Sequence, residues 1–319
     1  MTRPLNIVLV AEEAAGVQTL RFLTAGPHRV VAVLTGRGHG DDGRPPTTVV
    51  GAAAARVGCP VWPGRLVRSA ALAGTLRDLE IDLLLNVHSL FIVHGDVVAA
   101  PRIGSFNVHP GPLPAYAGLN VPSWAIYHGE RAHAVTVHWM EAAVDTGPIA
   151  YQAAVDITES DTGYTLSAKC VRAAVPMLRE LVSAAASGRG SIPRVSQADA
   201  PRRYCGRGAP NDGWLDWTAP ARRVVDFVRA ADYSPFQSPW GHPRTRVDGR
   251  ELAVVRARRT ALVADRPPGT VGSVADGSAL VATGDEWVRV ESVRQDGVLL
   301  EGSGALAPGE RLTPVPPRV

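Results

Sequence analysis

The first half of this 319-residue chain alternates short β-branched runs with segments of helical length, and this alternation constrains the fold more than any other feature. Strands are expected at 7–10, 30–34, 81–87 and 103–109, with a helix at 16–23 between the first two. The last two runs are apolar almost without interruption, which is typical of strands covered on both faces. The pattern therefore predicts an open, mostly parallel, Rossmann-like α/β sheet.

The second half has a different character. Two more strands, at 133–140 and 149–154, are followed by a long helix at 162–186 and then by a polar, proline-punctuated stretch. Thr218 stands where it can cap the next helix. From Arg244 onward, short strands separated by Gly, Pro and Asp predict a small, OB-like β-barrel.

These changes predict the domain organisation. An α/β domain is expected at residues 1–188, a linker at 189–209 and the barrel domain at 210–319. The length of the chain agrees with two domains, because one domain usually holds about 100–200 residues.

Composition excludes several classes of protein. Lys and Arg total 33 against 30 Asp and Glu, and a net charge of +3 is too small for a typical nucleic-acid or anionic-membrane binder. Cys59, Cys170 and Cys205 are far apart, so neither a disulfide framework nor a structural zinc site is expected. No run reaches the ~18 apolar residues of a membrane span. We expect a cytoplasmic protein, and nothing in the sequence fixes its oligomeric state.

The most informative stretch ends the strand at 103–109, where Asn107 and His109 precede a loop rich in proline. Side chains alternate along a strand, so Asn107 and His109 point to the same face. Polar groups at the end of a buried strand cost free energy unless they are partnered or used. A second polar element, the turn around Asp145, follows between the next two strands. Because active sites of parallel sheets lie beyond the carboxyl ends of the strands, these three residues are candidate catalytic residues.

An amide, an imidazole and a carboxylate in one cleft suit acyl transfer to an amine. Asn107 can donate a hydrogen bond to a developing oxyanion, worth about 3–4 kcal/mol where such donors have been removed. His109 can accept a proton from an attacking amine near neutral pH, and Asp145 can orient the imidazole. No Ser or Cys nucleophile motif is apparent, which favours direct transfer over a covalent intermediate.

These residues resemble the signature of the 10-formyltetrahydrofolate-dependent formyltransferases: Asn107-x-His109, then Leu113-Pro114, then Asp145-Thr146-Gly147. The resemblance covers most of the chain. It implies the formyltransferase fold in the first domain and a C-terminal barrel like that of the tRNA-formylating members. It also implies that Asn107, His109 and Asp145 are the catalytic residues.

The resemblance implies a folate slot and an acceptor site as well. In the family, the folate lies between the segment after the preceding strand and the loop that carries the Asp, where apolar side chains beside backbone amides suit a flat pterin. The matching folate-binding residues are Ser89, Leu90, Phe91, Ile92, Ala143, Val144 and Asp145. The acceptor residues expected are Pro110, Gly111, Tyr116 and Asn120. The expected formyl donor is 10-formyltetrahydrofolate, and no metal is expected.

Departures from the family pattern bear on the acceptor. Ala117 stands where the family often has an arginine, which removes a possible anion contact. The tRNA-formylating members carry a basic insertion after the second strand, whereas 36–44 here holds as many acidic residues as arginines, so tRNA is not the expected acceptor. The runs 118–125 and 232–241 look most like formylation modules of peptide-synthetase and polyketide assembly lines. The resemblance therefore favours the amine of a small or carrier-tethered metabolite.

Three other functions are consistent with the same residues. Water in place of the amine would make the protein a 10-formyltetrahydrofolate hydrolase. A non-catalytic protein could use the pocket to bind a metabolite or a carrier, and tRNA formylation is the third alternative. A metal site is not expected, because His88, His94, His128, His133 and His138 show no ligand spacing.

Overall fold

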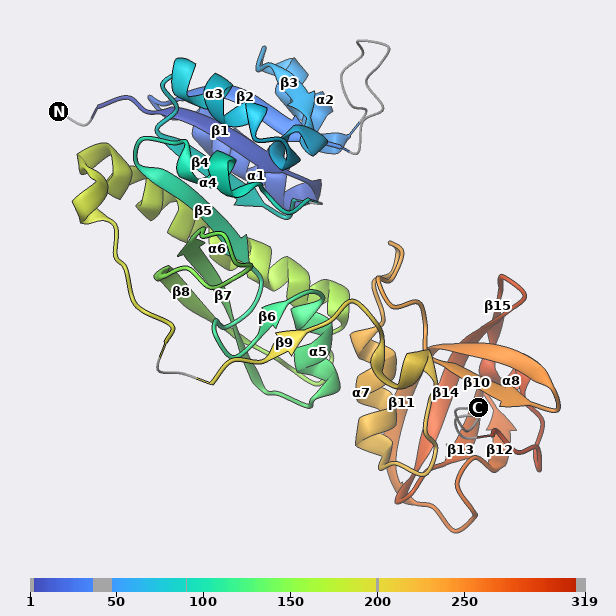
Figure 1. Cartoon of the computed structure of the whole chain (residues 1–319). Coiled ribbons are helices and arrows are strands. Elements are labelled where there is room, and N and C mark those ends of the chain that lie inside the picture. Colours follow the sequence, from blue (N-terminus) through green and yellow to red (C-terminus); the bar gives the residue numbers. More distant parts are fainter. Residues whose placement is uncertain (1–2, 37–47, 90, 199–200, 314–319) are drawn as a thin grey trace. The chain divides into compact units, whose positions relative to one another are not determined.

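The computed structural model describes residues 3–36, 48–89, 91–198 and 201–313 (Figure 1). Contacts divide the chain into two compact units. The first consists of residues 1–118, 134–155 and 169–204, and the second of residues 119–133, 156–168 and 205–319. The domain boundaries expected from the sequence, at 188 and 209, stay a prediction.

The first unit is built on a seven-stranded sheet with the strand order β3-β2-β1-β4-β5-β7-β8. Its strands are β1 (Asn6–Ala11), β2 (Arg29–Thr35), β3 (Val61–Pro63), β4 (Leu83–Val87), β5 (Gly104–His109), β7 (Ala132–Trp139) and β8 (Ile149–Asp156). The pairs from β3 to β5 are parallel, and β7 runs antiparallel to β5. The mostly parallel sheet predicted from the alternation of strands and helices is therefore confirmed.

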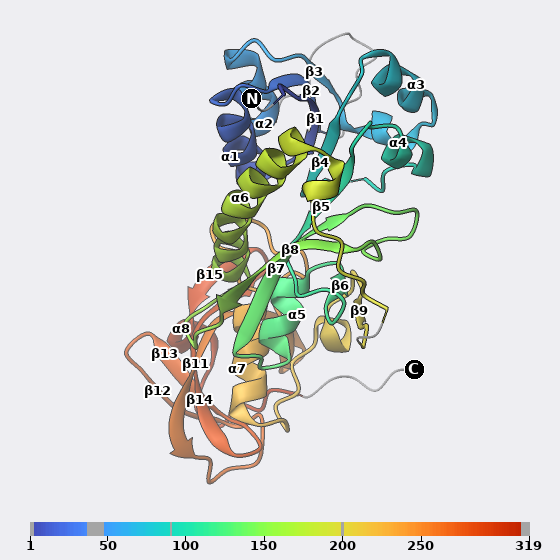
Figure 2. The same ribbon diagram turned by 90° about the vertical axis from the view of Figure 1, so that its left-hand side faces the viewer.

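Helices cover both faces of this sheet. They are α1 (Glu13–Thr24), α2 (Val49–Arg56), α3 (Ala71–Asp78), α4 (Gly95–Ala99) and α6 (Gly163–Ser187), with short 3₁₀ turns at Gly64–Arg68 and Arg189–Ser191. Figure 2 shows α1, α2 and α6 along one side of the strands and α3 and α4 along the other. Thr48 caps α2 by accepting a hydrogen bond from the Gly51 amide.

The interior of the sheet is continuously apolar. Residues 7–11 of β1 are all buried, and so are Leu83, Leu84 and Leu85 in β4, because helices cover both faces. The strand order reverses direction between β1 and β4, since β2 and β3 lie on one side of β1 while β4 and β5 lie on the other. Ligands of open α/β sheets bind beyond the carboxyl ends of strands near such a reversal.

The second unit holds an antiparallel sheet with the order β10-β11-β14-β13-β12, and β15 pairs with β14. These strands are β10 (Arg244–Val247), β11 (Arg250–Val263), β12 (Val271–Ala275), β13 (Ser278–Ala282), β14 (Glu286–Gln295) and β15 (Val298–Glu301). Bridges from Arg311 to Thr270 and from Thr313 to Arg246 connect the two outer strands through one further segment. This gives the sheet the closed path of a small barrel.

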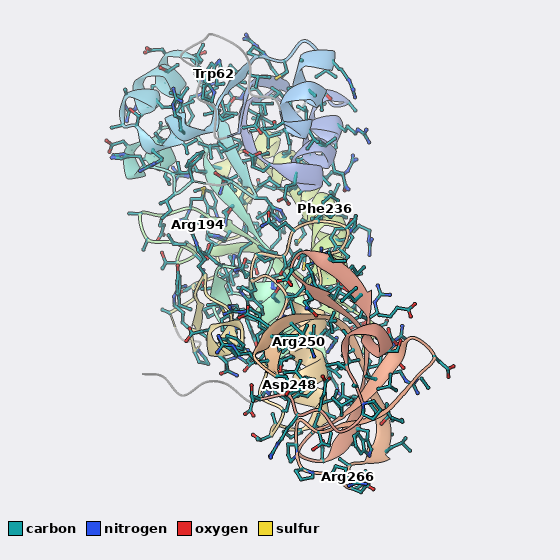
Figure 3. The ribbon with its side chains drawn as sticks, turned by 90° about the vertical axis from the view of Figure 1, so that its right-hand side faces the viewer. Trp62, Arg194, Phe236, Asp248, Arg250 and Arg266 are labelled. Carbon is teal, nitrogen blue, oxygen red and sulfur yellow. The ribbon has the colours of Figure 1, made fainter. Side chains whose placement is uncertain are left out.

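The other elements of the chain are short. They are α5 (Val121–Tyr127), α7 (Ala221–Ala230), α8 (Gly302–Ala305), a 3₁₀ turn at Pro210–Gly213, and a two-stranded sheet of β6 (Ala117–Gly118) and β9 (Tyr204–Cys205). Asp248 and Gly249, both with positive φ, form the tight turn between β10 and β11, which Figure 3 shows beside Arg250. No helix within the described ranges is long and apolar enough to cross a membrane.

The predicted helix cap at Thr218 is wrong. Pro220 occupies the N-cap position of α7, and the hydroxyl of Thr218 donates to Asp216 instead. The backbone amide of Ala221, at the start of α7, donates to the Asp285 carboxylate at 2.7 Å. Asp285 lies in the segment between β13 and β14. A carboxylate that is distant in the sequence therefore replaces the local cap.

Candidate active site

Asn107 and His109 lie at the carboxyl end of β5, on the same face of the strand, as the alternation of side chains predicts. The two strands beside β5 place polar residues in the same row: Asn107 pairs with Asn86 of β4 and with His138 of β7. A row of three polar side chains therefore crosses three neighbouring strands.

Asp145 meets both predicted catalytic partners. It lies in the turn between β7 and β8, and its Oδ2 is 3.5 Å from His109 Nδ1. Its Oδ1 is 3.5 Å from Asn107 Nδ2 and 3.5 Å from His138 Nε2. The Gly118 amide donates to Oδ2 at 2.9 Å, which fixes the carboxylate from a fourth direction. All three residues expected to be catalytic thus surround one buried point.

The glycine of Asp145-Thr146-Gly147 has a steric cause. A Cβ atom on Gly147 would lie 2.0 Å from the carbonyl oxygen of Trp139, well inside van der Waals contact. Any other residue at this position would push the turn away from β7. Asp145 itself has φ of 55°, in the left-handed region that Asp tolerates better than most residues.

His109 is buried on all sides by the protein. Its Nε2 lies 2.6 Å from the carbonyl oxygen of Tyr116, in the loop that follows β5. Because a carbonyl can only accept, Nε2 carries the hydrogen of the neutral ring. The unprotonated nitrogen, Nδ1, then faces the carboxylate of Asp145, and it is the nitrogen available to take up a proton.

Burial and charge act in opposite directions on the acid–base groups of the site. Burial alone would raise the pKa of Asp145, but the neighbouring imidazole of His138, the charge of His109 and the amide of Gly118 outweigh it and lower the pKa from 3.8 to about 2. Burial lowers the pKa of His109 below its ordinary 6.5, opposed by Asp145 and the Tyr116 carbonyl and reinforced by His138 and Arg202. At neutral pH the carboxylate is ionised and His109 is neutral.

Two neighbours that fix the orientation of Asn107 were not singled out as site residues from the sequence. Asn86 Nδ2 donates to Asn107 Oδ1 at 2.8 Å, so the amide nitrogen of Asn107 points the other way. His138 Nδ1 donates to the carbonyl of Trp139, so in the neutral ring Nε2 accepts from Asn107 Nδ2 at 3.1 Å. The sequence does show polar residues in the two strands next to β5. It does not show which of them lie opposite Asn107, because the register between strands cannot be read from the sequence.

The loops predicted to hold the folate expose apolar side chains. Ile92 is 73% exposed and Val144 is 41% exposed, while Ala143 is also exposed and Phe91 is partly buried. Ser89 shapes the first loop, since its Oγ accepts from the Phe91 amide. Leu90 lies outside the described residues.

The residues predicted to bind the acceptor lie in different surroundings. Tyr116 is buried beside His109, its ring under the guanidinium of Arg203, and the Gly111 carbonyl accepts from Thr136. Pro110 is partly buried directly after His109. Asn120 belongs to the second unit, where it precedes α5 and its side chain donates to the Arg207 carbonyl.

A cavity of about 510 Å³ lies against the Asp145 turn within the first unit. Thr146 and Pro148 of the turn line it together with Arg194, Gln197 and Arg202 from the segment after α6. Arg194, labelled in Figure 3, stacks over the ring of Trp139 at 4.2 Å. Within the described ranges, no group of three His, Cys, Asp or Glu side chains is placed to hold a metal ion.

Comparison with known proteins assigns both parts of the chain to one family. The formyl transferase profile matches residues 30–182, and the profile of the formyl transferase C-terminal domain matches residues 209–301. The methionyl-tRNA formyltransferase of Roseiflexus castenholzii is 33% identical over 297 residues, which cover 92% of this chain and 92% of that protein. The chain therefore belongs to the formyl transferase family, and it is a formyl-transferring enzyme.

Solved structures share the fold at lower identity. An N-formyltransferase from Helicobacter canadensis, crystallised with folinic acid and dTDP-3-aminofucose, superposes with a TM-score of 0.67 at 14% identity over 90% of this chain and 99% of that one. HypX from Aquifex aeolicus superposes with a TM-score of 0.65 at 18% identity over 96% of this chain. The match covers 49% of HypX, so this chain spans about half of its length. These likenesses show the formyltransferase fold.

Proposed function

We propose that the protein transfers a formyl group from 10-formyltetrahydrofolate to the primary amine of a small or carrier-tethered metabolite. One observation carries this proposal: Asp145, from a later turn of the chain, lies 3.5 Å from Asn107 and 3.5 Å from His109, which stand together at the end of β5. The folate supplies the formyl group, and the residues of the chain supply the acid–base and electrostatic groups.

In this proposal Asn107 acts as the donor to the oxygen of the formyl carbonyl. His138 accepts one Nδ2 hydrogen, and the bond from Asn86 to Oδ1 fixes the orientation of the amide. The second Nδ2 hydrogen, whose bond to Asp145 Oδ1 is long at 3.5 Å, is the one that donates to that oxygen as negative charge develops on it. Such preorganised donors stabilise a transition state more than a ground state.

His109 and Asp145 act on the proton of the amine. The attacking nitrogen must lose a proton as its bond to the formyl carbon forms, and neutral His109 can accept it at Nδ1. The bond from the formyl carbon to the folate nitrogen then breaks, and the imidazolium returns the proton to that leaving nitrogen. The ionised Asp145 lies beside His109 Nδ1 and stabilises the imidazolium that forms when this nitrogen takes up the proton. Because both groups are buried, their charges act with little screening by solvent.

The chemistry of the two exposed loops fits a folate. Ile92 and Val144 are exposed and offer apolar contacts to a flat ring. The related N-formyltransferase of Helicobacter canadensis was crystallised with folinic acid, a formylated folate, which supports the same choice of donor.

A mass-shift assay tests the proposal. The purified protein is incubated with 10-formyltetrahydrofolate and pooled amino sugars, amino acids and carrier-loaded aminoacyl groups, and products are analysed by mass spectrometry. We expect one acceptor to gain the mass of a formyl group, and His109→Ala to abolish the gain while circular dichroism shows an intact fold. Formate released at the same rate without any amine would instead identify a hydrolase, and folate binding without turnover would identify a binding protein.

Methionyl-tRNA is the second candidate acceptor, because relatives that match 92% of this chain carry that name. The balanced charge of 36–44 argues against it on electrostatic grounds, since binding to a nucleic-acid backbone needs a positive field. Adding charged initiator tRNA to the acceptor pool separates the two candidates. Formylation of methionyl-tRNA in preference to every small amine would replace the metabolite by tRNA and leave the chemistry at Asn107 unchanged.

A further inference from the structure

The backbone of the Asp145 turn is held by side chains that come from the polar segment after α6. Arg202 Nη1 donates to the carbonyl oxygen of Asp145 and Nη2 to that of Val144, each at 2.8 Å. Gln197 Nε2 donates to the carbonyl oxygens of Asp145, at 3.3 Å, and Gly147. Three carbonyls of one short turn therefore find their donors in this segment, all within the first unit.

The turn has few other bonds that would fix its shape. The bond from the Trp139 amide to the Pro148 carbonyl closes its base, and Thr146 Oγ1 donates to the Ala143 carbonyl. Asp145 has a positive φ, a conformation that an L-residue keeps only when its surroundings hold it. A planar guanidinium that donates two charge-assisted bonds can supply that hold in one geometry.

We propose that Arg202 and Gln197 are positioning residues, which hold the backbone of the Asp145 turn so that its carboxylate stays between His109, Asn107 and the Gly118 amide. This inference rests on the proposed function only in the sense that it concerns the same carboxylate. It changes the interpretation of the polar segment around residue 200, which the sequence suggests is a plain linker: two of its side chains act on the site through Asp145.

A purely electrostatic role for Arg202 is the competing explanation. The positioning role and the electrostatic role predict opposite changes in the pKa of His109 when Arg202 is removed. Burial is the main reason why the pKa of His109 is low; the charge of Asp145 raises it, while His138 and Arg202 lower it. If Arg202 contributed only its charge, Arg202→Ala would raise the pKa of His109. If Arg202 holds the turn, its removal lets the carboxylate move away, and the pKa of His109 falls.

The Gly118 amide reports the place of the carboxylate directly, since it donates to Asp145 Oδ2. We would compare the full-length wild type with Arg202→Ala, Arg202→Lys, Gln197→Leu and the control Arg207→Ala, an exposed arginine of the same segment. Amide hydrogen exchange at Gly118 and the imidazole titration of His109 are followed by NMR with labelled histidine and glycine, without donor or acceptor present.

We expect Arg202→Ala to lower the protection of Gly118 at least about tenfold, as for the loss of a charge-assisted bond, and to lower the pKa of His109. Lysine offers a single point charge without the fork, so Arg202→Lys should restore protection only in part. Gln197→Leu should act in the same direction, and Arg207→Ala should match the wild type. Exogenous guanidinium should restore part of the protection in Arg202→Ala, because the residue is exposed.

Unchanged protection of Gly118 in Arg202→Ala, or a raised pKa of His109, would overturn the inference. Neither readout depends on turnover, so the inference and the proposed function fail separately. A turn that loosens as expected in a protein that formylates no amine would leave the positioning role standing and remove the function. Formyl transfer at the wild-type rate by Arg202→Ala, with a protected Gly118 amide, would leave the proposed function standing and remove the positioning role.

Discussion

At the scale of single residues, Asp145 connects every polar group of the site. One oxygen accepts from Gly118 and faces His109, and the other faces Asn107 and His138. This carboxylate stays ionised at any pH at which the enzyme could work, since its pKa is about 2. The acid–base change that we propose for the site therefore belongs to His109 rather than to Asp145.

The pH dependence of formyl transfer should show this division. Protonated His109 cannot accept a proton, so kcat/KM should fall as the pH drops through the pKa of His109, which lies below 6.5. Asp145→Asn removes the charge that raises this pKa, so the acid limb should move to lower pH while the plateau falls. Initial rates between pH 4.5 and 9, with the acceptor found in the mass-shift assay, check both changes. An acid limb that moves to higher pH in Asp145→Asn would contradict the pairing of His109 with Asp145.

The orientation of Asn107 gives a second prediction at this scale. Asn86→Leu removes the donor that fixes Asn107 Oδ1 and keeps the branching and the number of non-hydrogen atoms of the side chain. The amide of Asn107 can then turn, so kcat should fall about tenfold, as for the loss of one neutral hydrogen bond. KM for the folate should change little, because Asn86 lies in strand β4 and not in the two loops that are proposed to bind the folate. A fall in folate affinity with an unchanged kcat would show that Asn86 acts on binding instead.

At the scale of elements, the Asp145 turn depends on glycine. Gly147→Ala places a methyl group against the Trp139 carbonyl, so the turn must shift and carry Asp145 with it. We expect formyl transfer to fall at least about a hundredfold, because misplacement of a catalytic group by ~1 Å has effects of this size. Gly190→Ala is the matched control, since its added methyl meets no atom within 4 Å. Equal activity of the two variants would show that the turn tolerates movement.

Six of the seven strands of the first sheet could be predicted because continuous apolar runs of strand length, separated by helices, indicate buried strands. The short edge strand β3 was not predicted, because three residues give no such run. Asn107 and His109 could be singled out from the sequence because polar side chains at the end of a buried strand cost free energy unless they are partnered or used. The pairing of Asn86 and His138 with Asn107 could not be predicted, since the register between strands is set by tertiary packing. The cap of α7 could not either, because its carboxylate, Asp285, lies 64 residues away in the sequence.

At the scale of the whole molecule, each unit has an apolar core of its own. One cluster of buried residues includes Leu252, Val281 and Val290 of the antiparallel sheet, and another includes Val8, Leu76 and Leu84 of the parallel sheet. Family profiles match the two parts separately, at residues 30–182 and 209–301. The three residues that we propose as catalytic, Asn107, His109 and Asp145, all belong to the first unit.

Separate cores predict separate unfolding transitions. Leu252→Ala leaves a cavity in the core of the antiparallel sheet and should cost about 2–5 kcal/mol there. Leu84→Ala does the same in the parallel sheet. Calorimetry should resolve two transitions, with Leu252→Ala lowering one and Leu84→Ala the other, and the Gly118 amide should lose its protection with the transition that Leu84→Ala lowers. A single transition that both variants shift equally would mean that the two cores unfold as one cooperative unit, and the catalytic residues would then depend on the barrel for their stability.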